Sequence, residues 1–320
     1  MDKHELQDVI EDLYGKYAPL NEGSLATYIP ELGKANPKDF GICLVSSAGR
    51  VFETGNCDQT FTIQSISKPF TFGIAINELG HDKVFQRVGV EPSGEPFNSI
   101  QLESVTNRPF NPMVNAGAIS VTALLHAQHG EETFEYIRSK MSGAAGRELE
   151  LDESVYRSEA STGHRNRAIA HLLLNFGMVH GQAEEALDVY FKQCSILVNC
   201  RDLATMAATL SNMGRNPITD NHVFHHWCVK DMLSIMFTCG MYDYSGQWAY
   251  RVGVPAKSGV SGGVMAVVNR QLGVATYSPP LDRYGNSVRG IGAFTELAAR
   301  LGLHAFDLMN SGSHFLDTVL

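Results

Sequence analysis

Residues 64–69 read Gln-Ser-Ile-Ser-Lys-Pro, and this stretch carries the first indication of both a fold and a chemistry. Proline is tolerated in a helix only in the first turn, so Pro69 predicts a helix that starts within a few residues of Ser65. The residue before a proline is biased away from helical angles, which here applies to Lys68. If the helix does start at this point, Ser65 and Lys68 lie three residues apart on one face.

A serine in that position is suited to nucleophilic attack. It lies beside unpaired backbone N–H groups at the positive end of the helix dipole, where a developing oxyanion is stabilised. The reaction also needs a neutral amine near the hydroxyl, and burial can lower the pKa of a lysine enough to provide one. Roughly one S-x-x-K is expected by chance in a chain of this length, so the motif alone also fits a capping serine and a surface lysine.

A second motif, Lys257-Ser258-Gly259, strengthens the first. In penicillin-recognising serine enzymes, a K-[ST]-G on a strand faces the S-x-x-K serine across a cleft. By composition, such a motif occurs in only roughly one chain in six. The overlapping stretch 259–263 also satisfies G-x-S-x-G, which would make Ser261 the nucleophile on a strand-to-helix elbow. The residues that follow, VMAVVN, are typical of a strand, so we favour Ser65.

Apolar spacing along the chain predicts the fold class. Residues 39–54 and 264–279 alternate like β-hairpins, the second turning at 269–271. Amphipathic helices are predicted at 1–18, 115–128, 164–178, 182–196, 201–214 and 292–305. Strands near both ends predict an α+β fold, in which an antiparallel sheet is flanked by helices and an all-helical domain is inserted. We place the sheet domain at 1–66 and 229–320, the helical domain at 67–228, and the active site in the cleft between them.

Composition excludes several classes of function. A net charge of −9 over 320 residues, without a basic run, gives no reason to expect binding to nucleic acid or to an anionic membrane. No apolar stretch reaches eighteen residues and no secretory signal is recognisable, so a cytoplasmic protein is expected. The six cysteines show no CxxC spacing and are interpreted as reduced structural thiols. Without HExxH or a His–Cys cluster, neither a metal nor a cofactor is expected.

Eight blocks in this order closely resemble the glutaminase family, the serine-dependent enzymes that share the β-lactamase/penicillin-binding-protein fold. The resemblance runs from about Tyr28 to the C-terminus and matches the compact bacterial type. The blocks are TYIPELG, QSISKPF, EPSGEPFN, NPMVNAGAIS, SEASTGHRNRAIA, YFKQCSI, CGMYDYSGQWAY and VPAKSGVSGG. The resemblance implies hydrolysis of the side-chain amide of L-glutamine through a γ-glutamyl ester on serine.

The resemblance also implies a role for each matching residue. Ser65 matches the nucleophile and Lys68 its activating lysine; whether Lys68, Tyr242 or the pair takes the proton stays open. The ammonium of glutamine is matched to Glu159, and its carboxylate to neutral donors. The full implied substrate-binding set is Tyr28, Gln64, Ser65, Asn115, Glu159, Asn166, Tyr190, Tyr242 and the backbone of Val260.

Two other functions and an assembly remain open at this stage. The same fold serves penicillin-interacting peptidases and lactamases, and a non-catalytic glutamine sensor could keep the pocket. Family resemblance and the prevalence of closed symmetry also predict a homo-oligomer, a dimer or a tetramer. Residues 91–109 match the family's loop between the active site and a subunit interface.

Overall fold

A computed structural model describes residues 3–94, 98–181 and 183–307. Its centre is a five-stranded antiparallel sheet with the strand order β2-β1-β7-β6-β5. The strands are β1 (Gly41–Ser46), β2 (Val51–Gly55), β5 (Ala256–Ser258), β6 (Gly263–Val268) and β7 (Leu272–Tyr277). Both predicted hairpins are present, and β1 pairs with β7. Segments more than 200 residues apart in the sequence therefore close one sheet.

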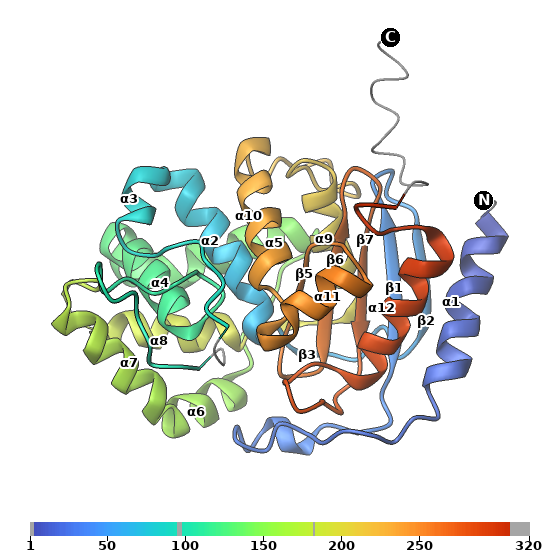
Figure 1. Ribbon diagram of the computed structural model, residues 1–320, viewed down its shortest axis with the longest axis horizontal. Helices are drawn as coiled ribbons and strands as arrows, with labels where there is room; N and C mark the ends of the chain where they lie inside the picture. Colours follow the sequence, from blue (N-terminus) through green and yellow to red (C-terminus); the bar gives the residue numbers. More distant parts are fainter. Residues whose placement is uncertain (1–2, 95–97, 182, 308–320) are drawn as a thin grey trace, which may run out of the picture.

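Both faces of the sheet are buried, because side chains on a strand alternate between two helical layers. Ile42 and Leu44 of β1 pack in a core with α1 (Lys3–Tyr17), α11 (Ser245–Arg251) and α12 (Val288–Leu301). The intervening Cys43 and Val45 pack in the other core, to which α9 (Cys200–Ser211) contributes. Figure 1 shows these helices on either side of the strands.

The remaining helices form a second body beside the sheet (Figure 1). They are α2 (Ser67–Leu79), α3 (His81–Phe85), α4 (Asn115–His129), α5 (Thr133–Ala145), α6 (Glu153–Thr162), α7 (His164–Asn175), α8 (Ala183–Cys194) and α10 (His226–Cys239). A two-stranded sheet of β3 (Phe61–Thr62) and β4 (Leu197–Val198) joins this body to the chain that leads into α2. Short 3₁₀ turns are η1 (Leu32–Lys34), η2 (Gln64–Ile66), η3 (Gly130–Glu132) and η4 (Tyr242–Tyr244).

The α+β architecture predicted from the sequence is confirmed, and each predicted helix overlaps an observed one. The last helix starts earlier than predicted, at Val288 instead of residue 292. The predicted domain limits do not separate the helices that pack on the sheet from the other helices. Within 67–228, α9 lies directly on the sheet, and α10 runs across the limit at residue 228. The division into these two domains stays a prediction.

Two structural features bear on the classes of function considered above. Within the described ranges, no helix combines the length and the apolar character needed to cross a bilayer. The same residues contain no group of three His, Cys, Asp or Glu side chains arranged to hold a metal ion. All six cysteines are buried free thiols.

Candidate active site

Ser65 lies in η2, in the 3₁₀ turn immediately before α2. The turn is entered through Gln64, whose φ of +51° is a left-handed conformation that non-glycine residues rarely adopt. The Ser67 hydroxyl donates a 2.7 Å hydrogen bond to the Gln64 carbonyl, which braces this turn. Pro69 is the third residue of α2. Backbone N–H groups in the first turn have no acceptor within the helix, so a proline, which lacks this group, costs no hydrogen bond there. The proline therefore does mark a helix start, two residues later than the serine.

Lys68 is buried beneath Ser65, with 1% of its surface exposed. Its Nζ donates hydrogen bonds to the Met113 carbonyl at 3.1 Å and to Asn115 Oδ1 at 2.7 Å, both neutral acceptors. Burial lowers the pKa of Lys68 to about 8, because the charged ammonium is removed from water. A lysine with this pKa is a neutral base in roughly a tenth of the molecules at pH 7.

Tyr242 approaches Ser65 from the sheet side. It lies in η4 with a φ of +55°, and its hydroxyl donates a 3.0 Å hydrogen bond to the Ser258 carbonyl. Burial raises the pKa of Tyr242, and a hydrogen bond with Ser65 opposes that rise. Lys257 Nζ lies 4.2 Å from the centre of the Tyr242 ring, a cation–π contact. Burial, followed by the charge of Lys68, holds the pKa of Lys257 well below its usual value.

Glycine at 259 allows the K-[ST]-G strand to reach the serine. A Cβ atom at this position would lie 3.0 Å from the Ile63 carbonyl oxygen and 3.2 Å from Ile66. The end of β5 therefore packs directly on the turn that carries Ser65. Ser261, the competing nucleophile, lies in the turn between β5 and β6, and a strand follows it in place of the helix that an elbow requires.

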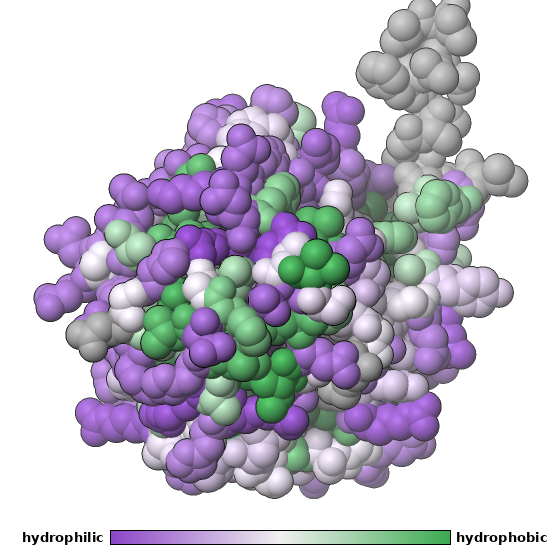
Figure 2. Space-filling model, turned by 60° about the vertical axis from the view of Figure 1, so that its left-hand side comes forward, coloured by the Kyte–Doolittle hydropathy of each residue, from purple (hydrophilic) through white to green (hydrophobic). Residues whose placement is uncertain are grey.

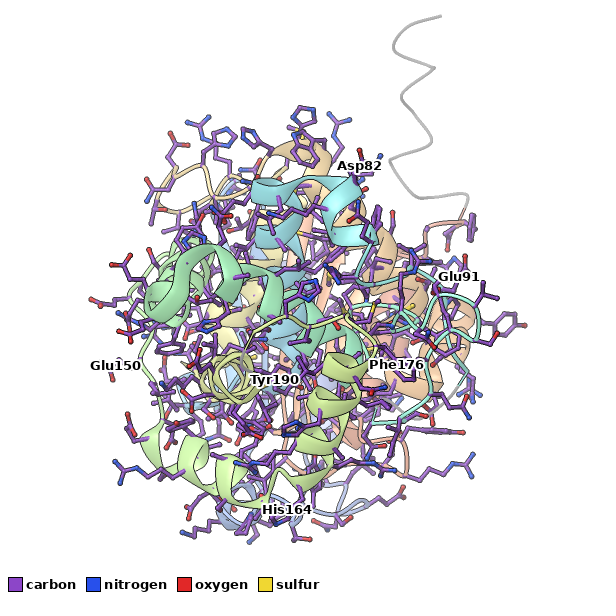
Figure 3. All side chains as sticks on the ribbon, turned by 90° about the vertical axis from the view of Figure 1, so that its left-hand side faces the viewer. Asp82, Glu91, Glu150, His164, Phe176 and Tyr190 are labelled. Carbon is purple, nitrogen blue, oxygen red and sulfur yellow. The ribbon has the colours of Figure 1, made fainter. Side chains whose placement is uncertain are left out.

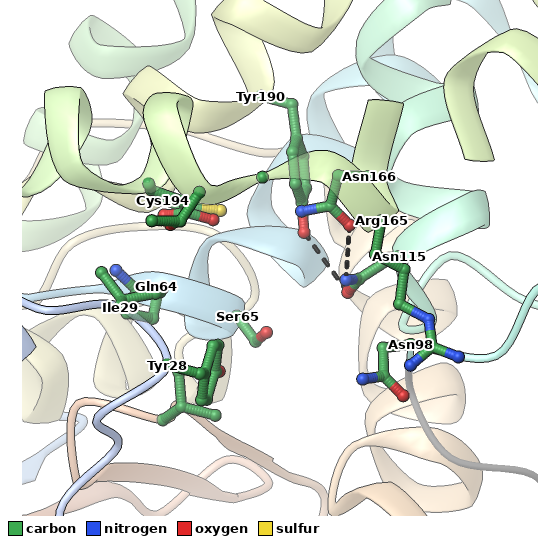
Figure 4. A pocket seen from close by; sticks show the side chains of 14 residues that line it. Tyr28, Ile29, Gln64, Ser65, Asn98, Asn115, Arg165, Asn166, Tyr190 and Cys194 are labelled. Atoms are coloured by element: carbon green, nitrogen blue, oxygen red, sulfur yellow. Dashed lines mark hydrogen bonds between the residues drawn. The ribbon is translucent and has the colours of Figure 1, made fainter. Parts of the chain in front are cut away.

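A cavity of about 240 Å³ opens above Ser65 (Figure 4). Its lining contains eight of the residues predicted to bind substrate, namely Tyr28, Gln64, Ser65, Asn115, Glu159, Asn166, Tyr190 and Val260. Tyr242 instead lines a second cavity of about 210 Å³, and Lys68, which is buried, lines neither of the two. The structure thus brings all of these predicted residues into one region, although the sequence separates them by more than 200 positions.

A polar network joins one wall of the cavity to Lys68. Asn115 Oδ1, which accepts from Lys68, also accepts a longer hydrogen bond of 3.4 Å from the Tyr190 hydroxyl. Asn115 Nδ2 donates to Asn166 Oδ1 at 2.9 Å (Figure 4, dashed lines). Tyr190 comes from α8, which lies among the other helices at that end of the molecule (Figure 3). The amide of Asn115 therefore links Lys68 to two other polar residues of the cavity, Asn166 and Tyr190.

Glu159 is a buried carboxyl group in the same cavity, 7% exposed. Burial raises its pKa to about 8, while a hydrogen bond from Gln64 and the charge of Lys68 oppose that rise. Within the described part of the chain, Glu159 Oε2 has no hydrogen-bond partner. A buried, unsatisfied carboxylate oxygen is costly, and a ligand that brings an ammonium group would remove that cost.

Sequence reasoning missed part of the lining, namely Ile29, Asn98, Thr162, Gly163, Arg165 and Cys194. Arg165 matters most, because it is the single Lys or Arg among the described residues that line the cavity. It lies beside Asn98, away from Gln64 and Cys194 (Figure 4). The residues predicted to bind a carboxylate were all neutral donors. The signal that could have identified Arg165 in the sequence was its position directly before Asn166, at the start of α7.

Comparisons with known proteins agree with one another. The model of the glutaminase family matches residues 23–306. A glutaminase of Trichormus variabilis is 54% identical, covering 94% of this chain and 90% of that protein, and one from a Nostoc species is 53% identical over 96% and 92%. Among solved structures, the probable glutaminase ybaS is 41% identical with a TM-score of 0.92, covering 96% of this chain and 99% of the other. The structure of Mglu in its glutamate form is 40% identical with a TM-score of 0.91, over 96% and 71%.

Proposed function

This chain belongs to the glutaminase family, and on that premise we propose that it hydrolyses the side-chain amide of L-glutamine to L-glutamate and ammonia through an ester on Ser65. One observation carries the proposal of a serine mechanism. Ser65 lines the cavity, and three residues further on Lys68 has a pKa that burial lowers to about 8. A serine hydroxyl becomes an effective nucleophile only when such a base accepts its proton.

In the first half of the reaction, Ser65 Oγ forms a bond to the side-chain carbonyl carbon of glutamine. Its proton passes to Lys68, to Tyr242, or to the two acting together, since Lys68 contacts Asn115 of the cavity and Tyr242 contacts Ser65. Burial keeps Tyr242 protonated, so Tyr242 accepts this proton only as it passes on its own. The C–N bond then breaks, and the leaving nitrogen takes up a proton from the same groups and departs as ammonia. In the second half, water attacks the γ-glutamyl ester, glutamate leaves, and the Ser65 hydroxyl regains its proton.

The backbone N–H groups of Ser65 and Val260 are the proposed oxyanion donors. Val260 is the second residue of a turn closed by a 3.0 Å hydrogen bond from the Gly262 N–H to the Gly259 carbonyl. In a β-turn, that hydrogen bond does not use the N–H of the second residue, which is therefore available to a ligand. Each well-placed donor of this kind contributes about 3–4 kcal/mol to stabilising the transition state.

The charges of the cavity suit a zwitterionic α-amino acid. Glu159 supplies the acceptor for the ammonium group through its unpaired Oε2. Asn115, Asn166 and Tyr190 supply neutral donors for the carboxylate, and Arg165 adds a positive charge to the same lining. Once Glu159 has lost its proton, a ligand with one positive and one negative group finds one partner of each sign.

The test is ammonia release with glutamine, comparing wild type with Ser65→Ala and with Ser261→Ala as the matched control. We expect Ser65→Ala to lose turnover and to bind glutamine still in a calorimeter, because the other contacts remain. Adding Glu159→Gln to the Ser65→Ala background should weaken that binding by leaving the ammonium unpaired. Wild-type ammonia release from Ser65→Ala, or its loss from Ser261→Ala, would assign the nucleophile to Ser261.

The same assay separates the other functions open to this fold. Turnover of nitrocefin without ammonia release from glutamine would indicate a penicillin-interacting enzyme. Calorimetric binding of glutamine with no ammonia release by wild-type protein would indicate a sensor. We expect ammonia from glutamine and no hydrolysis of nitrocefin.

A further inference from the structure

Arg289, the second residue of α12, is a buried cation far from the catalytic serine in the sequence. Only 2% of its surface is exposed. Within the described residues, its hydrogen-bond acceptors are neutral oxygens, and no carboxylate forms an ion pair with it. Burying a charge without a counter-charge destabilises the folded state. Arginine at this position therefore indicates a role that a neutral residue could not fill.

The guanidinium connects the two ends of one segment. Nε donates to the Leu20 carbonyl at 3.0 Å, and Nη1 donates to the Pro37 carbonyl at 2.8 Å. Residues 20–39, which we call the Tyr28 segment, run between these two points without an α-helix or a named strand. The segment contains the 3₁₀ turn η1, and paired backbone hydrogen bonds between Ser24 and Leu281 fasten it near its start. The rest is irregular chain, which is displaced more easily than a helix or a strand.

The middle of the Tyr28 segment forms one wall of the cavity. Tyr28 and Ile29 line the cavity directly. Two residues earlier, Ala26 belongs to a small apolar cluster with Tyr242, Val260 and Leu281. Contacts at the two ends of the segment, together with the Ser24–Leu281 pair, therefore limit how far Tyr28 can move relative to Ser65.

Arg289 is also connected to the turn that contains Val260. Its Nη1 donates to Ser278 Oγ at 3.0 Å, and the Ser278 N–H donates to the Gly262 carbonyl, also at 3.0 Å. Gly262 closes the turn that contains Val260, the proposed oxyanion donor. One guanidinium thus joins the segment that carries Tyr28 to the turn that carries Val260.

We propose that Arg289 is a positioning residue for the substrate cavity, which holds Tyr28 in place by fastening both ends of the Tyr28 segment to the sheet. The proposal rests on the proposed function, because it takes Tyr28 to contact the substrate. Arginine is needed because its planar fork directs several donors in fixed and different directions. Lysine keeps the charge, but a single ammonium group on a flexible stem does not span Leu20 and Pro37 together.

The experiment is a double-mutant cycle on ammonia release from glutamine, with wild type, Arg289→Lys, Tyr28→Ala and the double variant. Arg289→Lys should lower kcat/KM about tenfold, since charged hydrogen bonds that position the wall are lost. If Arg289 acts through Tyr28, the double variant should be no more than about twofold worse than Tyr28→Ala alone. Arg300→Lys makes the same change on the exposed side of α12, where the partners are Glu296 and Asp12, and should behave like wild type.

Losses that multiply in the double variant would overturn the proposal, because they would mean that Arg289 supports the fold without acting through Tyr28. If Arg289→Lys is too unstable to assay, Ser278→Ala replaces it in the cycle and is judged by the same criterion. Ser278→Ala removes one hydrogen-bond acceptor of the guanidinium and leaves Arg289 itself in place. An additive result there would also overturn the proposal.

A second readout is independent of activity. Amide hydrogen exchange of residues 20–39 should accelerate in Arg289→Lys and stay unchanged in Arg300→Lys. Unchanged exchange in Arg289→Lys would overturn the anchoring role. Wild-type protein that releases no ammonia from glutamine would instead refute the proposed function, and the exchange data would then still decide whether Arg289 anchors the segment.

Discussion

At the scale of single residues, Lys68 and Glu159 are two buried groups whose protonation states the proposed reaction requires. Burial lowers the pKa of Lys68 to about 8 and raises that of Glu159 to about 8. As the pH rises through this range, Lys68 loses its proton and becomes a base, while Glu159 loses its proton and becomes the carboxylate that an ammonium group needs. Both changes favour the reaction, so kcat/KM should rise from about pH 6 to about pH 8.

Replacing Lys68 with arginine tests this assignment. Arginine keeps the positive charge but does not deprotonate near neutral pH, so it removes the base. We expect Lys68→Arg to lose about two to four decades of kcat/KM, as is usual when a positioned proton carrier is removed. The measurement is kcat/KM for glutamine from about pH 6 to about pH 9.5 in both proteins. A variant within about threefold of wild type, or a flat wild-type profile, would make Lys68 a structural residue.

Arg165 supplies the second prediction at this scale. It is the cation in the described cavity lining, so it should attract the α-carboxylate of the substrate. Arg165→Met should raise KM for glutamine about tenfold, the size expected for one hydrogen bond to a charged group. The α-methyl ester of glutamine lacks that charge and should be affected little. Arg157→Met removes a guanidinium from the exposed side of α6 and serves as the control. Equal losses for both substrates would show that Arg165 does not recognise the carboxylate.

At the scale of elements, the periodicity of apolar residues located helices and strands, but not the turns that contain the candidate catalytic residues Ser65 and Tyr242. The pattern at 64–69 predicted a helix start, whereas Ser65 lies in a 3₁₀ turn before it. Gln64 and Tyr242 both have positive φ values, which sequence reasoning assigns to glycine by default. These conformations persist because surrounding contacts impose them, as is common at functional sites. No local signal in the sequence reports such contacts.

The contact between α9 and β7 gives a prediction about stability. Gly273 of β7 lies so close to α9 that a Cβ atom would be 2.2 Å from the Ala208 nitrogen and 2.3 Å from the Ala204 carbonyl oxygen. Gly273→Ala must push the helix from the sheet, and overpacking of this kind costs about 1–3 kcal/mol in the free energy of unfolding. Urea unfolding measures the change. Gly15→Ala in α1, where a Cβ meets no atom within 4 Å, should instead stabilise by about 0.5–1 kcal/mol. Equal effects of the two changes would contradict the close packing of α9 on β7.

At the scale of the whole molecule, the sequence predicted the fold class and most of the cavity, but not how its walls are held. The predicted strands at 39–54 and 264–279, with helices between them, indicated one sheet closed from distant segments. Residues 20–39 lacked any periodic pattern, and their path depends on Arg289, whose role no local rule indicates. Hydrophobic spacing identifies a buried face without identifying what covers it. For that reason it also could not show that α9 packs on the sheet.

Assembly of the molecule remains a prediction. On the face that includes the helical body, apolar side chains gather in an area surrounded by polar ones (Figure 2). The resemblance implies that residues 91–109 form the family's loop between the active site and a subunit interface. Within this stretch Val105 is 90% exposed and Ile100 is 44% exposed. We predict a symmetric dimer or tetramer, with Val105→Asp shifting the equilibrium toward monomers. Sedimentation at micromolar concentration measures both proteins. Monomeric wild-type protein would contradict the prediction.

In the proposed function, the two bodies of the molecule hold opposite ends of the substrate, so their relative placement decides between glutamine and asparagine. Glu159, on α6 of the helical body, would hold the ammonium group, while the turn containing Val260 at the edge of the sheet would hold the reacting carbonyl oxygen. A simple apolar pocket distinguishes one methylene by only about 1–3 kcal/mol. With both ends fixed, a shorter side chain also draws the amide carbon away from Ser65, and a displacement of about 1 Å can cost a hundredfold in rate. Asparagine should therefore be a poor substrate mainly through a lower kcat, with KM changed less. Steady-state ammonia release from both amides measures this, and a comparable kcat for asparagine would mean that the two anchors are wrongly assigned.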